Sequence, residues 1–255
     1  MLKLVKYEVR RNRNWMIIVL LAAIALQGYF LGASYLKNEE HMVMSGMFLV
    51  MATVFVVYAL LIAGVSMYSR ELSAKSSYLT FMTPNSATKI LGAKVLTVAF
   101  LCVGFAALLM GFAAWDYQIL RGQYPQLNMM FLLSQFNMRS VGIDMTIQEV
   151  IWMLVQFGMG AVVTFFTTVM IAYLAITLSA TVLQNKKFKW LISGLLFAAI
   201  FFGMQWVMGK IPMTGNYSSM QAVLRSLIPH FLLELGVMIV SFFLSAWLLE
   251  KKVSL

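Results

Sequence analysis

The chain has 255 residues, of which 62% are hydrophobic and only 11% are charged. Soluble domains carry about 25% charged residues, so this composition excludes a mainly water-soluble protein and indicates an integral membrane protein. The net charge of +10 does not point to nucleic-acid binding, because the basic residues lie at the ends of apolar runs, where membrane topology places them. No alternation typical of barrel strands is visible, so we expect an all-α chain that crosses the membrane as helices.

The chain begins with the basic segment "MLKLVKYEVRRNRN". Its charge density, and the lack of a small-residue cleavage site after the next apolar run, argue against a cleavable signal peptide. The apolar residues Leu2, Val5 and Val9 fall on one helical face, and Arg10 is among the basic residues that follow. We therefore predict that residues 1–14 form an amphipathic interface helix that leads directly into the membrane.

Six apolar runs are each long enough to cross a bilayer, which requires about 20 residues. They predict one transmembrane domain over residues 1–255, with spans at about 15–36, 42–68, 88–114, 147–183, 190–209 and 229–249. The fourth run begins with a capping box formed by Thr146 and Glu149. At about 55 Å this helix exceeds a hydrocarbon layer of about 30 Å. It should therefore tilt, break or project beyond the membrane.

The distribution of Lys and Arg predicts the orientation of these spans. Fourteen of the 19 basic residues fall on the side that holds both termini, and five fall on the other side. The positive-inside rule then places both termini in the cytoplasm.

A polar cytoplasmic segment, residues 69–87, joins the second and third spans and contains "SRELSAKSSYLTFMTP". Lys75, Tyr78 and Leu79 share one helical face with Met82, and Pro84 ends the helical pattern. An apolar and aromatic face surrounded by charges favours a contact with another protein. The alternative is an interfacial helix that only orients the spans.

A second amphipathic segment, "SSMQAVLRSLIPH", lies between the fifth and sixth spans. Its apolar residues recur at helical spacing after two serines that can cap a helix. We expect an outer helix here that lies in the membrane interface.

The sequence offers little catalytic or metal-binding chemistry. His41 and His230 have no metal-ligand spacing, and "GMQWVMGKI" lacks the glycine spacing and the Ser/Thr of a phosphate loop. Cys102 is the only cysteine and can form no intrachain disulfide. We therefore expect no cofactor and no metal in this chain.

His230 and Glu234 are i, i+4 neighbours on the sixth span. They are either a polar pair that anchors the helix near the outer interface or a contact for a substrate. The other polar residues inside the spans are Gln27, Gln156, Gln205 and hydroxyls. Ion-coupled carriers usually show acidic residues within their spans, so we expect the energy source to lie outside the chain.

Three features together resemble one family. They are the opening "MLKLVKYEVRRNRNW", the link "SRELSAKSSYLTFMTPNSATKILGAKVL" and the six spans with an amphipathic outer helix. The chain resembles, over essentially its whole length, the permease subunit of type-2 ATP-binding-cassette (ABC) exporters, in particular the short Gram-positive kind.

The resemblance implies a multi-pass protein of the bacterial plasma membrane that works with a separate cytoplasmic ATPase. Two permeases, expected as a homodimer, would assemble with two ATPase subunits, which would bind ATP and Mg²⁺. The cytoplasmic link would be the coupling helix that docks on the ATPase, and the N-terminal helix would lie along the membrane and also touch it. The contacts carried over onto this sequence are Arg70, Glu71, Leu72, Lys75, Tyr78 and Leu79.

The implied function is export of an amphipathic or hydrophobic cargo between two copies, along the second and fifth spans. Antimicrobial or toxin peptides are the first expectation, and lipids or drugs the alternative. The permease itself would not be an enzyme. Two rivals from other classes are a stand-alone membrane enzyme, for which only His230 and Glu234 could begin a catalytic cluster, and an ion-coupled carrier.

Overall fold

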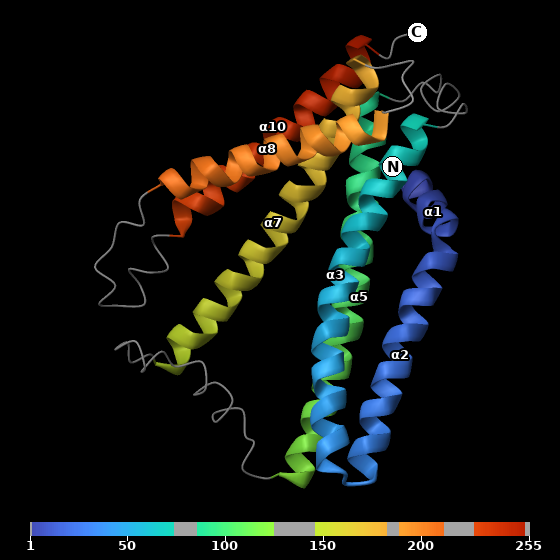
Figure 1. Cartoon of the computed structure of the whole chain (residues 1–255), viewed down its shortest axis with the longest axis vertical. Helices are drawn as coiled ribbons and strands as arrows, with labels where there is room; N and C mark the ends of the chain where they lie inside the picture. Colours follow the sequence, from blue (N-terminus) through green and yellow to red (C-terminus); the bar gives the residue numbers. More distant parts are fainter. Residues whose placement is uncertain (1, 74–85, 125–145, 183–188, 212–226, 253–255) are drawn as a thin grey trace. The chain divides into compact units, whose positions relative to one another are not determined.

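The computed structural model describes residues 2–73, 86–124, 146–182, 189–211 and 227–252, and no strand occurs in these ranges. They form seven helices (Figure 1). In chain order these are α1 (Leu2–Arg11), α2 (Arg13–Tyr35), α3 (Glu39–Ser73), α5 (Ala87–Gln123), α7 (Ile147–Val182), α8 (Lys189–Lys210) and α10 (Ile228–Lys252).

Six of these helices, all except α1, are long and apolar enough to cross a membrane. They confirm the all-α fold with six spans. Two boundaries differ from the predicted ones. The helix α5 continues past residue 114 to Gln123, and α3 continues to Ser73. Arg70, Glu71 and Leu72 are therefore the last turn of a spanning helix and not the start of a separate segment.

The helix α7 is unbroken from Ile147 to Val182. Of the three predicted ways to fit so long a helix into a bilayer, breaking is therefore excluded. Its first turn is closed by the predicted capping box. The Thr146 backbone N–H donates to Glu149 Oε2 over 2.9 Å, and the Glu149 N–H donates to Thr146 Oγ1 over 3.3 Å.

The helices α1, α2, α3 and α5 form one compact unit, in which polar side chains join neighbouring helices. Between α2 and α5, Gln27 Nε2 donates to Asp116 Oδ1, and Gln123 Nε2 donates to the Ser34 carbonyl over 2.8 Å. These bonds explain why α5 runs on beyond its apolar stretch. Its polar residues Asp116 and Gln123 are hydrogen-bonded to partners on α2, so they do not end the helix.

A tight turn joins α2 to α3. Lys37 has a φ of 52°, which is the left-handed conformation that usually favours glycine. Asn38 Oδ1 accepts from the His41 N–H over 3.3 Å and so caps the start of α3. Tyr124 Oη donates to Glu39 Oε1 over 3.3 Å. Desolvation first, and then the Glu39 carboxylate, raise the pKa of Tyr124 above its ordinary value.

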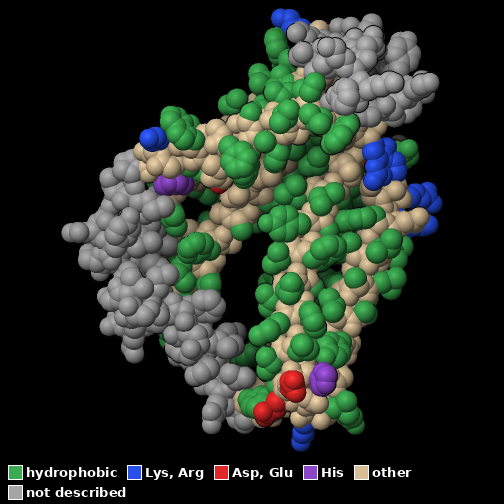
Figure 2. Space-filling model, viewed as in Figure 1, with side chains coloured by type: hydrophobic (Ala, Val, Ile, Leu, Met, Phe, Trp, Pro, Cys, Tyr) green, Lys and Arg blue, Asp and Glu red, His purple; other side chains and the backbone are tan. Residues whose placement is uncertain are grey.

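The two ends of this unit differ in charge (Figure 2). Arg10, Arg11 and Arg13 lie on or beside α1, and Arg70 lies at the end of α3. Glu39 and Glu40 begin α3 at the opposite end. The helix ends thus carry the charge bias from which the cytoplasmic side was predicted.

The helices α7, α8 and α10 belong to the second compact unit. Half of the apolar window of α7 (50%) is buried, against 28% or less in each of the other five spans. Val169, Ile171, Tyr173 and Ala175 of α7 are fully buried. The helix α7 is therefore the core of this unit, and α8 and α10 pack against it.

The apolar surface of both units is extensive (Figure 2). Phe100 is 63% exposed, Met110 72% and Trp206 68%. A soluble monomer rarely exposes contiguous apolar surface on this scale. In a bilayer the same side chains contact lipid.

Candidate functional site

Two polar sites are built into the apolar helices, and each lies within one of the two units. The first ties α1 to the neighbouring spans in the unit of α1, α2, α3 and α5. The second is a cavity between α7 and α10.

The first site is a buried ion pair centred on Glu8, the only acidic residue of α1. Lys94 Nζ of α5 donates to Glu8 Oε1 over 3.0 Å, and the two side chains are only 3% and 7% exposed. Taking two charges out of water is costly unless they pair with good geometry. This short contact therefore fixes α1 against α5.

Two further residues complete the connection. Arg11 Nη2 lies 3.5 Å from Glu8 Oε2 and 3.5 Å from the Met67 carbonyl oxygen of α3. Asn12 Nδ2 donates to the Glu8 carbonyl over 2.9 Å at the junction with α2. The N-terminal helix is thus bonded to both α3 and α5, close to the ends that flank residues 74–85.

The predicted interface-helix residues take up these positions. Leu2 lies in α1, Val5 and Val9 are half-buried, and Arg10 is exposed. The helix prediction for this segment is therefore confirmed for residues 2–11.

The predicted ATPase contacts divide into two groups. Arg70, which is exposed, Glu71 and Leu72 lie in the last turn of α3. Lys75, Tyr78 and Leu79 lie outside the described residues, as does most of the predicted outer helix between the fifth and sixth spans. Only the end of that segment is described, and its residues from Ile228 onwards belong to α10.

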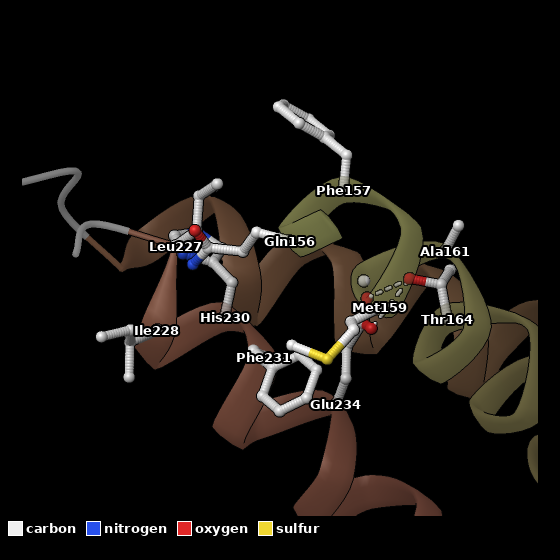
Figure 3. Close-up of a pocket in the computed structure, with 11 residues that line it drawn as sticks. Gln156, Phe157, Met159, Ala161, Thr164, Leu227, Ile228, His230, Phe231 and Glu234 are labelled. Atoms are coloured by element: carbon white, nitrogen blue, oxygen red, sulfur yellow. Dashed lines mark hydrogen bonds between the residues drawn. The ribbon is translucent and has the colours of Figure 1, made fainter. Parts of the chain in front are cut away.

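The second site is a cavity of about 540 Å³ between α7 and α10 (Figure 3). This volume lies within the range of small-molecule sites, about 300–1,000 Å³. Its walls are mostly apolar and come from both helices and the residue before α10: Phe157, Met159, Gly160, Ala161, Leu227, Ile228 and Phe231. Four polar side chains also line it: Gln156, Thr164, His230 and Glu234.

The carboxylate of Glu234 lies against α7 (Figure 3). Thr164 Oγ1 is 3.0 Å from Glu234 Oε1 and 2.8 Å from Oε2, and it donates its single proton to this carboxylate. Thr167 Oγ1 donates to the Glu234 carbonyl over 3.2 Å. Two threonines of α7 thus hold the start of α10 in register.

His230 lies one turn before Glu234 and lines the same cavity. Its Nδ1 is buried and has no hydrogen-bond partner within the described ranges. The predicted i, i+4 pair does share one site, but the hydrogen bonds to the Glu234 carboxylate come from α7. Sequence reasoning missed Thr164, for which the only signal was a hydroxyl in the middle of an apolar helix.

The sequence also raises the questions of metal binding and of its single cysteine. Within the part of the chain that the structure describes, no three His, Cys, Asp or Glu residues lie close enough to hold a metal ion. Cys102 is half-buried on α5.

Comparisons with known proteins add no relative to this picture. No family model matches the chain, and no curated protein and no solved structure matches it. The six apolar helices of membrane length define a multi-pass membrane protein.

Proposed function

We propose that this chain is the permease subunit of an ABC exporter in the bacterial plasma membrane. It carries an amphipathic or hydrophobic cargo, first of all a peptide, out of the cell. The energy comes from ATP and Mg²⁺ bound to a separate ATPase subunit, and two copies of the chain form the passage. The observation that carries the proposal is the buried Glu8–Lys94 pair, which links the basic N-terminal helix to α5, together with the contact of Arg11 with the Met67 carbonyl, which links it to α3.

This connection suits a protein moved from outside by a partner. A subunit docked on the cytoplasmic link would act on the adjoining ends of α3 and α5. Arg11 and Lys94 join α1 to those same helices, so the three elements would move together as a rigid body. An isolated turn between two spans would transmit much less of that motion.

The exposed basic residues at this end support a protein partner. Arg10 and Arg70 are exposed on α1 and α3, where they are free to pair with carboxylates of an ATPase. Such rim charges contribute mainly to association rate and specificity. The anchor would come from Tyr78 and Leu79, on the basis of their sequence pattern.

The test is co-purification of an ATPase with the tagged chain. Replacing Tyr78 and Leu79 by Asp should abolish recovery of a protein with a P-loop and should abolish transport. The matched control is Tyr35→Asp/Leu36→Asp. These residues form the same dipeptide at the end of α2 that lies away from α1, and they are 88% and 77% exposed. The proposal fails if the ATPase still co-purifies with the Tyr78→Asp/Leu79→Asp variant.

A second candidate is an ion-coupled carrier, which the carboxylate of Glu234 beside a cavity favours. Acidic groups within spans often form part of an ion pathway. The purified chain alone would then transport its substrate down an imposed ion gradient, and Glu234→Gln would stop it. The permease proposal expects no transport in this experiment.

A further inference from the structure

The cavity between α7 and α10 contains a carboxylate whose hydrogen-bonding capacity is only partly used. An ionised carboxylate has about four lone-pair sites, whereas Thr164 offers the two oxygens a single hydroxyl proton. No Lys or Arg lies within ion-pair distance of Glu234 in the described ranges. A carboxylate in an apolar helix bundle is expensive without a positive partner.

The other polar groups of the cavity are neutral side chains: the Gln156 amide, the Thr164 hydroxyl and, when it is unprotonated, the His230 ring. The buried Nδ1 of His230 has no partner among the described residues, and when it is unprotonated it accepts a hydrogen bond. Among the described residues that line the cavity, only Glu234 has a full charge when histidine is neutral. The polar side of the cavity therefore complements a group that is positively charged, and it repels an anion.

The remaining walls suit an apolar body. Met159 and Phe231 both line the cavity (Figure 3). Thioether and aromatic surfaces adapt to varied apolar shapes, and an aromatic ring also attracts a cation. At Gly160 an added Cβ atom would meet nothing within 4 Å, so the cavity extends to the backbone of α7.

We propose that this cavity binds a lipophilic cation, with its positive group against Glu234 and its apolar body between Met159 and Phe231. The role of this cavity as a cargo site rests on the proposed export function, whereas binding of the cation does not depend on that function. The positive group belongs either to a lipophilic amine or drug or to an amphipathic cationic peptide. Competition between these two kinds of molecule for the same site identifies the natural source.

The experiment measures equilibrium binding of radiolabelled tetraphenylphosphonium to the full-length chain, without an ATPase, in phosphatidylcholine nanodiscs. Tetraphenylborate has nearly the same size and the opposite charge, so it separates charge recognition from partition into apolar surface. Because the two ions pair with each other in solution, the binding of tetraphenylborate is measured in a separate sample, and we expect saturable binding of the cation and none of the anion. Adding a cationic amphipathic peptide or a lipophilic amine to the same assay shows which of them displaces the probe.

Two substitutions test the two halves of the site. Glu234→Gln keeps the shape and a hydrogen-bond acceptor for Thr164, and we expect it to weaken binding about tenfold or more, a factor that corresponds to about 1.4 kcal/mol. Gly160→Leu fills the cavity from a position with open space and should abolish binding even if the Gln variant folds poorly. Two control variants should bind the cation as the native chain does. Gly158→Leu is also on α7 in open space but lies outside the cavity lining. Glu250→Gln changes a carboxylate that is exposed at the far end of α10.

The proposal is overturned if Glu234→Gln or Gly160→Leu binds the cation with native affinity, or if tetraphenylborate, measured in its own sample, binds the native chain as tightly as the cation does. Failure of the export function would look different. In that case binding would depend on Glu234 and Gly160 as described, but the cation would neither be transported nor change ATP hydrolysis when the chain is combined with its ATPase.

Discussion

The buried Glu8–Lys94 pair allows a quantitative test of how α1 is held. The proposed perturbations are Glu8→Leu, Lys94→Met and the double variant. Because both side chains are less than a tenth exposed, solvent screening weakens the interaction little. Removing one partner of a buried pair leaves the other charge uncompensated and typically costs about 3–5 kcal/mol.

The two single variants should not be equal. Glu8→Leu removes the carboxylate that accepts from Lys94, and breaking this buried pair should cost about 3 kcal/mol or more. Lys94→Met leaves Glu8 with Arg11 at 3.5 Å, a side chain that is 33% exposed. That weaker partner should limit the loss to about 2 kcal/mol.

The double variant should recover most of the loss, because two apolar side chains can replace a buried ion pair at little cost. We expect it within about 1 kcal/mol of the native chain, so that the three values are strongly non-additive. The assay is equilibrium unfolding of the purified chain in mixed micelles with a rising fraction of dodecyl sulfate, followed by tryptophan fluorescence. Arg10→Met, on the exposed side of α1, is the control and should change stability by less than about 0.5 kcal/mol. Additive single effects, within about 0.5 kcal/mol, would refute the idea that this pair fixes α1 to α5.

Three further predictions concern the helix ends and the part-buried Gln27–Asp116 pair. Thr146→Ala keeps the backbone N–H but removes the hydroxyl that donates to Glu149 Oε2 and accepts from the Glu149 N–H at the start of α7, and it should cost about 1 kcal/mol. Hydrogen exchange should rise in the first turn of α7, while Gln148→Ala should leave it unchanged. Lys37→Gly should raise the midpoint of thermal unfolding, because it removes the steric strain of a side chain on a left-handed backbone, a gain of about 1 kcal/mol. Leu36→Gly is the control. Its backbone has an ordinary φ of −74°, so this variant should lower the midpoint. Gln27→Leu should cost about 1–3 kcal/mol, because it leaves Asp116 without its donor. The double variant with Asp116→Leu should recover much of this loss in the same unfolding assay. A double variant less stable than Gln27→Leu would contradict the pairing.

Hydropathy alone was enough to predict the number of spans and most of their ends within a few residues. The helix α5 is the exception, and its reason is physical. Asp116 breaks the apolar run and so predicts the end of a span, but Gln27 of α2 donates to it and Ser34 accepts from Gln123. A polar residue ends a span only if no neighbouring helix satisfies it.

The sites were less predictable, because each depends on residues far apart in the chain. Glu8 and Lys94 are 86 positions apart, and Thr164 and Glu234 are 70 apart. The sequence shows Glu8 as the lone acidic residue of a basic helix, and it shows Lys94 near the start of α5. A single sequence does not say which basic side chain pairs with which acidic one. The i, i+4 spacing correctly brought His230 and Glu234 to one place, but it could not reveal the cavity, which depends on how α7 packs against α10.

The most direct test of the proposed export function is transport by proteoliposomes that contain the purified chain with and without its ATPase. The account predicts movement of an amphipathic cationic peptide only when both proteins and hydrolysable ATP are present, and none when an ion gradient alone is imposed. Transport by the chain alone, with or without a gradient, would contradict it.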